Sequence, residues 1–275
     1  MSAIASPTTA PAEPSTVALG LSRAVFEIRG YFRRGDQMFF TFLFPIVMLA
    51  IFSTAFSGLD LGPDLTAASY YLPAMLAAGI LTSGLQNLGI DIATERHDGT
   101  LKRLAGTPLS PASYFIGKIG QVLATGVTQA ALLIAIGHVV FGVDLPDDAG
   151  RWLVFAWVLL LGLATSALIG IAIAQLPRSA KSAGAVITPV VLVLQFISGV
   201  YLQFSMLPEW LQNLASVFPL KWMAQGMRYV FLPDSLAAME QGGNWNLTGV
   251  ALSLAGWLVV GFVVARLTFR WIRKD

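Results

Sequence analysis

Six stretches of the sequence contain no charged residue, and each is long enough to cross a lipid bilayer. They hold 23 to 27 residues apiece, whereas a helix needs only about 20 to span the hydrocarbon core. Backbone polar groups inside a bilayer must be satisfied within the segment, so we expect helices. None shows the alternating polarity of a membrane β-barrel strand. The sequence therefore predicts an all-α membrane protein whose six transmembrane helices lie near residues 38–57, 70–93, 114–141, 152–176, 184–204 and 247–269.

Charge supports this interpretation and gives the chain an orientation. Only 12% of the residues are charged, about half the share typical of soluble domains. If the N-terminus is cytoplasmic, 14 of the 17 lysines and arginines lie on the cytoplasmic side, as the positive-inside rule requires. The three on the outer side are Arg151, Lys221 and Arg228. We therefore expect a multi-pass protein of the cell membrane (plasma or inner membrane) with both termini in the cytoplasm.

The region before the first predicted span divides into two parts. Its first 14 residues, 1–14, are rich in Ala, Pro, Ser and Thr, which predicts a disordered tail. Over residues 15–35, Leu21 and Val25 recur at helical spacing while Glu27 falls on the opposite side. This pattern is typical of an amphipathic helix that lies in the inner membrane interface with its basic residues toward the headgroups. The alternative is a soluble cap helix, and we favour the interfacial one because the chain leads straight into the first span. From residue 15 to residue 275 we expect a single domain.

The last outer loop contains the stretch "LPEWLQNLASVFPLKWMAQGMRY". Two prolines at suitable positions for a helix start predict short helices near 207–218 and 219–232. Neither is long enough to cross a bilayer, and the segment carries charged and aromatic residues suited to the membrane surface. We therefore expect two short re-entrant helices at the outer face. The residues assigned to this element are Pro208, Trp210, Pro219 and Arg228.

The chemistry available to the chain argues against an enzyme and against an ion-coupled transporter. The two histidines, His97 and His138, are expected on opposite sides of the membrane, and there is no cysteine, so no metal cluster is predicted. Asp91, Lys118 and Arg266 lie near the inner ends of their predicted spans, away from the midplane where transporters place ionisable residues. No phosphate-binding loop is present. Energy for any transport must therefore come from another protein.

One segment between the second and third predicted spans stands out by its charge. It reads "ERHDGTLKRLAGTPLSP", residues 95–111, and we expect it on the cytoplasmic side. Asp98 can cap a short helix over 99–105, and the Gly-Thr-Pro sequence that follows would end it. Leu101 and Leu104 would share one face of this helix. The segment is interpreted either as a docking element for a cytoplasmic partner or as a solvated loop whose charges only set the topology.

This segment resembles the first intracellular loop of the ABC-2 type permeases, the membrane subunits of ATP-binding-cassette exporters such as the daunorubicin-resistance type. The pattern there is E-R-x-x-G-T-L-x-x-L-x-x-T-P-L-S, followed by G-K. The matching residues are Glu95, Arg96, Gly99, Thr100, Leu101, Leu104, Thr107, Pro108, Leu109, Ser110, Gly117 and Lys118. The outer loop is similar to the family's element before the final span. One departure is Lys102-Arg103, where the family often carries an acidic residue.

The resemblance implies a permease subunit of an exporter that moves a hydrophobic or amphipathic substrate (drug, lipid or peptide) outward. It implies no cofactor in this chain, with ATP and Mg held by a separate cytoplasmic cassette ATPase. The other implied partners are a second copy of the chain or a related permease, and membrane lipids, with no nucleic acid. A bacterial membrane is expected. The residues that would couple to the ATPase are Glu95, Arg96, Asp98, Gly99, Thr100, Leu101, Lys102, Arg103, Leu104, Thr107 and Pro108.

The resemblance also implies that the second and fifth spans line the substrate path. This points to the neutral polar residues Gln86, Asn87, Gln195 and Ser198. Each of them could instead bond a neighbouring helix, as amides buried in membranes usually do. An alternative function, a membrane scaffold or immunity (resistance) protein without transport, is also compatible with the same topology.

Overall fold

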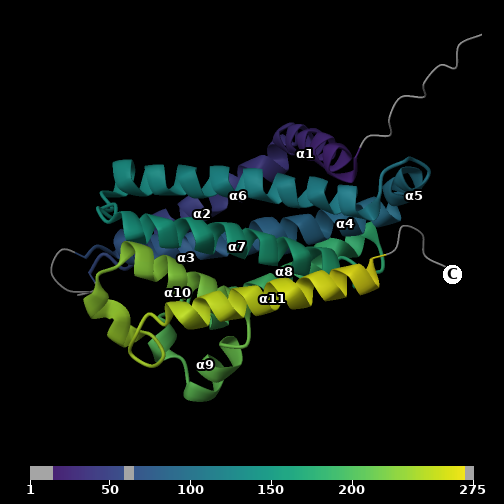
Figure 1. Cartoon of the computed structure of the whole chain (residues 1–275). Helices are drawn as coiled ribbons and strands as arrows, with labels where there is room; N and C mark the ends of the chain where they lie inside the picture. Colours follow the sequence, from purple (N-terminus) through teal and green to yellow (C-terminus); the bar gives the residue numbers. More distant parts are fainter. Residues whose placement is uncertain (1–14, 59–64, 270–275) are drawn as a thin grey trace, which may run out of the picture.

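The computed structural model describes residues 15–58 and 65–269, and the regular elements in these ranges are all helical (Figure 1). The tail expected at residues 1–14 lies outside the described residues. In chain order the elements are α1 (Thr16–Phe32), α2 (Gly35–Ala55), α3 (Ala67–Leu81), the π-helical η1 (Thr82–Asn87), α4 (Leu88–His97), α5 (Thr100–Ala105), α6 (Pro111–Phe141), α7 (Ala149–Ile173), α8 (Ala180–Ile197), η2 (Phe204–Met206), α9 (Glu209–Ala215), α10 (Pro219–Phe231), η3 (Asp234–Met239) and α11 (Leu247–Thr268).

Five of the described helices, α2, α6, α7, α8 and α11, are long and apolar enough to cross a membrane. They lie lengthwise beside one another and form the body of the molecule (Figure 1). The span expected near 70–93 corresponds to three consecutive elements, α3, η1 and α4, which together cover residues 67–97. In its described residues the chain is therefore an all-α, multi-pass membrane protein, as the charge-free stretches predict.

Helix α8 is shorter than the span expected over 184–204, because the chain turns at Gly199. The helix ends at Ile197, and Gly199 adopts a left-handed conformation with φ 76°. The amide of Val200 then donates to the carbonyl of Gln195 at 3.3 Å, a bond that closes the helix end as in a Schellman motif. The chain is thereby directed into the segment that carries α9 and α10.

Local sequence signals explain where several helices begin. The Ser110 side chain accepts a hydrogen bond from the amide of Ser113 at 3.1 Å, and Pro111 occupies the first turn of α6. A serine cap followed by a first-turn proline is a common way to begin a helix. Pro219 likewise lies in the first turn of α10, whereas Pro208 is the residue before α9. Both short helices of the last loop are thus present, at Glu209–Ala215 and Pro219–Phe231.

Helix α3 lies at the centre of the bundle. Of its 15 residues 14 are buried, which is expected of a helix that is apolar on all sides. Its continuation η1 lies against α7 at very short range: a Cβ added to Gly84 would be 2.4 Å from the Cβ of Ser166, and one added to Gly170 would be 2.3 Å from the Gly84 carbonyl oxygen. The small residues of α7 therefore serve close packing against η1, as small residues commonly do between membrane helices.

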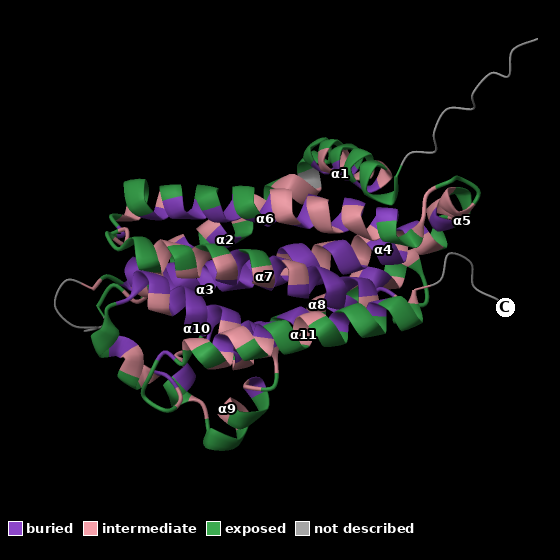
Figure 2. Cartoon of the chain, in the orientation of Figure 1, coloured by how far each residue is buried: buried purple, intermediate pink, exposed green. Residues whose placement is uncertain are grey.

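Helix α1 packs along α6 (Figure 1) with the face opposite to the one that an apolar pattern would select. Its buried residues include Ala24 and Glu27, whereas Leu21 and Val25 are exposed. In Figure 2 much of the α1 ribbon is coloured as exposed. The placement of Leu21 and Val25 suits a helix in the membrane interface. Glu27, which falls on the polar side of the predicted helix, faces the interior of the molecule, because a lysine of α6 binds its carboxylate there.

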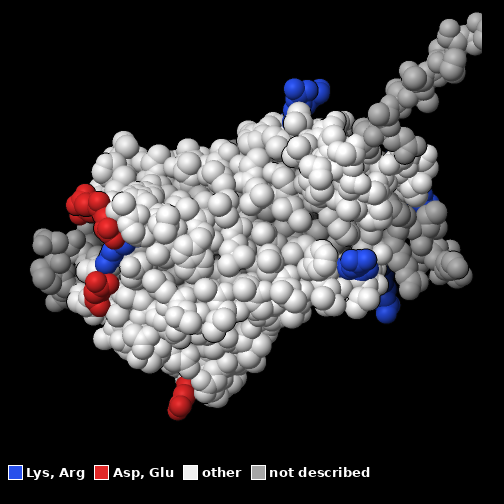
Figure 3. Space-filling view, in the orientation of Figure 1, with Lys and Arg blue, Asp and Glu red and all other residues white. Residues whose placement is uncertain are grey.

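The charged side chains are distributed unevenly along the molecule. In Figure 3 acidic side chains gather at the end where α10 lies, and most of the visible basic ones lie toward the opposite end. That opposite end carries α5 and the C-terminal turns of α11 (Figure 1). We refer to these as the α10 end and the α5 end of the bundle.

Candidate coupling loop, ion cluster and cavity

Helix α5 is held at its start by two residues of the conspicuous charged segment. Gly99 has φ 83°, a left-handed conformation that glycine adopts without steric cost. A carboxylate oxygen of Asp98 accepts from the amide of Thr100 at 2.8 Å. At the other end the Thr107 hydroxyl donates to the Leu104 carbonyl at 2.7 Å, just before Pro108. The predicted short helix is therefore present, and it begins one residue later than expected.

The two leucines of α5 do not form an exposed pair. Leu101 is only 1% exposed and belongs to the main hydrophobic core, and Leu104 is half-buried against it. Lys102 and Arg103 are exposed instead. The prediction that both leucines are offered to a partner is thus wrong for Leu101, whose burial in the chain's own core fixes α5 to the bundle. The surface that α5 presents is basic.

The end of α4 is tied to the loop that follows α7. Arg96 donates to the backbone carbonyl of Gln175 at 3.1 Å and to its side-chain oxygen at 2.7 Å, and also to the carbonyl of Pro177. Three bonds from one guanidinium give a charge-assisted link between the end of α4 and the loop after α7. Arg96 therefore anchors the residues that lead into α5.

A buried ion cluster lies immediately beside this anchor. The Lys118 ammonium of α6 is 0% exposed and contacts three carboxylates: Asp91 at 2.6 Å, Glu95 at 2.6 Å and Glu27 at 3.1 Å. Asp91 and Glu95 lie on α4, one turn apart, and Glu27 lies on α1. The cluster therefore joins three helices by charge, and the helix that carries two of its members is linked to α5 by the two-residue turn Asp98–Gly99.

Further donors complete the cluster. Arg34, at the junction of α1 and α2, donates to Asp91 at 2.8 Å. The Tyr114 hydroxyl donates to Glu95 at 2.6 Å, and Arg23 pairs with Glu27. Three carboxylates thus face three cations, and a buried group of charges is tolerated when it is paired and hydrogen-bonded in this way.

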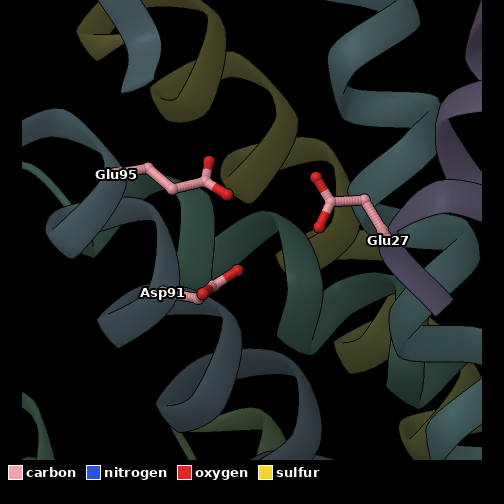
Figure 4. A group of neighbouring side chains, drawn as sticks. All are labelled: Glu27, Asp91 and Glu95. Atoms are coloured by element: carbon pink, nitrogen blue, oxygen red, sulfur yellow. The ribbon is translucent and has the colours of Figure 1, made fainter. Parts of the chain in front are cut away.

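The three carboxylates point toward one another from two helices (Figure 4), and their ligand atoms lie within 4.8 Å of one another. Such a set could hold a divalent cation. In this molecule the Lys118 ammonium already lies within hydrogen-bond distance of all three, so the positive charge that they require comes from the chain itself. The geometry therefore favours a structural ion cluster over a metal site.

A cavity of about 400 Å³ opens farther along the same continuous helix, around η1. Of the four predicted path residues, Gln86, Asn87 and Gln195 line it, whereas Ser198 is fully buried and does not. No sequence pattern points to the other lining residues, because they come from α2, η1 and α8 and only the fold brings these elements together. These lining residues are Gln37, Phe40, Thr41, Phe44, Thr82, Thr188 and Leu192.

Each predicted amide of the cavity also bonds a neighbouring helix. Asn87 donates to the Thr41 hydroxyl at 3.0 Å, Gln86 to Thr188 at 3.3 Å, and Gln195 to Thr82 at 3.3 Å. These bonds join η1 to α2 and α8. Helix bonding and cavity lining are therefore combined in the same side chains, and their contact with a substrate stays a prediction.

The segment near the α10 end buries two cations that the sequence would leave at a surface. Arg228 binds the carboxylate of Glu240 and donates to the carbonyl of Gly199 at 3.1 Å. Lys221 is 1% exposed. The expectation of exposed charges in this loop is therefore wrong for both residues, whereas Trp210 is exposed as a residue of a membrane surface would be.

The family of the chain follows from comparison with known proteins. Residues 24–232 match the family model described as ABC-2 type transporter. The chain belongs to this family, and its class is that of a membrane permease of an ABC transporter.

Several curated proteins are similar. The probable multidrug ABC transporter permease YbhR of Escherichia coli K12 is 25% identical over 186 residues, which is 67% of this chain and 50% of that protein. The inner membrane transport permease YadH of the same strain is 23% identical over 194 residues, 68% of this chain and 74% of that one. The putative transport permease ycf38 of Porphyra purpurea is 24% identical over 230 residues, 82% and 75%. The chain thus matches half the length of YbhR.

Proposed function

We propose that this chain is the membrane-spanning subunit of an ABC exporter and is driven by ATP hydrolysis on a separate cassette ATPase. It moves a hydrophobic or amphipathic substrate, such as a drug, lipid or peptide, out of a bacterial cell. The chain has six spans, with both termini and α5 in the cytoplasm, and α9 and α10 lie half-inserted at the outer face. A second copy or a related permease completes the substrate path.

The observation that carries this proposal is the mechanical continuity from α5 to the cavity. Helix α5, which exposes a basic face, is the next helix in the chain after α4. Helix α4 carries Asp91 and Glu95 of the ion cluster. A force on α5 is therefore transmitted to α4, and through Lys118 to α6 and α1. Since α4 continues into η1, the same displacement reaches the cavity wall. An ATPase that contacts α5 differently in its two states would bias two states of the membrane unit.

The cavity supports an uncharged or amphipathic substrate. Its described lining residues carry amides, hydroxyls and apolar groups, without a charged side chain. Apolar walls with a few polar groups are typical of sites for small organic molecules. The side-chain amides that hydrogen-bond η1 to its neighbours can exchange these partners for a ligand with donors and acceptors of its own. Such hydrogen bonds are individually weak in membranes.

The test compares charge reversals at two places of the α5 end. The chain is co-expressed with the cassette ATPase encoded beside its gene, purified and placed in liposomes. We expect Lys102→Glu with Arg103→Glu to lower ATPase co-purification and substrate-stimulated ATP hydrolysis at least tenfold. The matched control is Arg178→Glu with Lys181→Glu, which reverses two other exposed cations and should retain both properties. The leucines are unsuitable for this purpose, because Leu101 is part of the core.

Two results would contradict the proposal. If both charge reversals behave alike, α5 is not the ATPase contact. If the intact chain neither binds an ATPase nor stimulates hydrolysis, the exporter interpretation fails, and a membrane scaffold or an immunity protein becomes the better interpretation.

A further inference from the structure

A second large hollow lies at the α5 end of the bundle, on a side of the molecule built from other elements. It is a groove of about 530 Å³ between the first turns of α6, the last turns of α7 and the last turns of α11. Phe115, Leu168, Phe262 and Phe269 form much of its wall. It shares no lining residue with the cavity around η1. The groove is therefore a separate feature from the proposed substrate path.

The groove carries one charged side chain among its described lining residues, Arg266. This arginine lies in the last turn of α11 and is exposed. Within the described part of the chain it makes no hydrogen bond or ion pair, in contrast to Arg34 and Arg96. A guanidinium without a protein partner at the rim of an apolar groove is suited to the planar, two-point recognition of a phosphate.

The surroundings of the groove are apolar on the outside as well. Neighbouring side chains of α11, among them Val259, Val263 and Leu267, are exposed, and in a membrane protein such a face meets lipid tails. The groove thus opens onto the lipid-facing surface, while its cation lies at the end of the helix. Basic sites between membrane helices are a common form of lipid headgroup recognition, and the volume lies within the range of ligand sites.

We propose that this groove binds one anionic phospholipid, with its phosphate at Arg266 and part of an acyl chain against Phe115, Leu168 and Phe262. An anionic lipid is favoured over a zwitterionic one because the described lining supplies positive charge and no carboxylate. A soluble phosphate would leave the apolar walls in water, so the lipid is the occupant. The inference does not depend on the ATPase, the substrate or the direction of transport.

The test measures lipid adducts of the purified chain by native mass spectrometry in detergent. Dioleoyl phosphatidylglycerol and dioleoyl phosphatidylcholine are added separately at equal concentration. We expect phosphatidylglycerol to bind at least fivefold more strongly. Arg266→Gln should reduce its binding to the level of phosphatidylcholine, whereas Arg178→Gln, which removes another exposed arginine, should change nothing. Ala112→Trp, which fills the groove from an exposed lining position, should reduce the binding of both lipids.

Three results would overturn the proposal. The first is equal binding of the two lipids to the intact chain. The second is phosphatidylglycerol binding to Arg266→Gln at the level of the intact chain; because this side chain is exposed, the variant folds and the result is decisive even if Ala112→Trp does not fold. The third is full displacement of phosphatidylglycerol by an equal concentration of glycerol 3-phosphate, which would assign the site to a soluble phosphate.

Discussion

Two lysines of this chain are almost completely buried, at opposite ends of the bundle, and their surroundings differ in kind. Lys118 contacts three carboxylates from two other helices. Lys221 donates to the amide oxygen of Gln225 and lies 3.9 Å from the ring centroid of Trp222. Glu240, a carboxylate of the same region, forms its ion pair with Arg228 and not with Lys221. The two lysines are almost equally buried, but Lys118 is stabilised by ion pairs and Lys221 by an amide dipole and an aromatic ring.

The two ends of the bundle therefore respond differently to a change of charge. An ion cluster of three helices loses much free energy when any member is withdrawn, because uncompensated charges then remain inside. A lysine held by an amide and an aromatic ring can release its proton and remain buried as a neutral amine. The α5 end is thus fixed by charge, which suits transmission of force, whereas the α10 end tolerates a change of protonation.

The largest effect is expected from removing the cation of the first site. Lys118→Met leaves three buried carboxylates without their common partner and should destabilise the chain by about 3–5 kcal/mol. The measurement is unfolding of the purified chain in detergent, with Lys181→Met as a control at an exposed position. Adding Glu95→Gln to Lys118→Met should recover part of the loss. Unfolding close to that of the intact chain would contradict the importance of the cluster.

The second expected effect is a pH dependence that arises from the other lysine. Burial lowers the pKa of Lys221 to about 8, below its usual value of about 10.4. Between these values the unfolded chain holds a proton that the folded chain has released, so the free energy of unfolding rises with pH by up to about 1.4 kcal/mol per unit. The free energy of unfolding begins to rise near pH 8. Below pH 8 Lys221 is protonated in both the folded and the unfolded chain and adds no pH dependence.

Unfolding in detergent between pH 7 and pH 10 checks this expectation, with Lys221→Met measured in parallel. The contribution of Lys221 is the difference between the two curves, since the other titrating groups are common to both. Parallel curves across this range would show that Lys221 keeps its proton, and the contrast between the two lysines would then disappear.

The smallest effect concerns a neutral member of the first site. Tyr114→Phe removes the hydroxyl that donates to Glu95 but leaves all the charges paired. We expect a loss of about 1.5 kcal/mol, the range of a hydrogen bond to a charged acceptor. A double-mutant cycle with Glu95→Gln isolates this bond. If the two single losses add up to the loss of the double variant, the hydrogen bond between Tyr114 and Glu95 does not stabilise the cluster.

Much of the fold can be predicted from the sequence, and there is a physical reason for each feature that cannot. Charge-free stretches locate the long helices because the bilayer excludes charge, and the Ser110-Pro111 pair marks a helix start by local chemistry alone. The face of α1 could not be assigned in this way. In a membrane the exterior is as apolar as the core, so the stripe of Leu21 and Val25 does not say which side packs.

The candidate site was predictable only in part, for a related reason. Glu95 and the charged loop were recognisable from a family pattern, but their connection to Lys118 and Glu27 requires knowledge of which helices lie side by side. Gln86 and Asn87 were recognisable as polar residues within a span. Their partners Thr41 and Thr188 were not, because a threonine hydroxyl in a membrane helix can bond its own backbone and leaves no distinctive pattern.

The π-helical turn η1 has a consequence for the angular phase of the helix that contains it. An α-helix rotates by about 100° per residue, and a wider turn accommodates an additional residue without breaking the helix. Everything after η1, including Asp91, Glu95 and the approach to α5, is therefore offset around the axis relative to α3. Gain or loss of one residue at η1 would rotate the charged half against the buried half. A single helix can in this way pack mainly against α10, α2 and α6 with its first half and against α8 and α7 with its second. The rotation between the two halves is set by one turn.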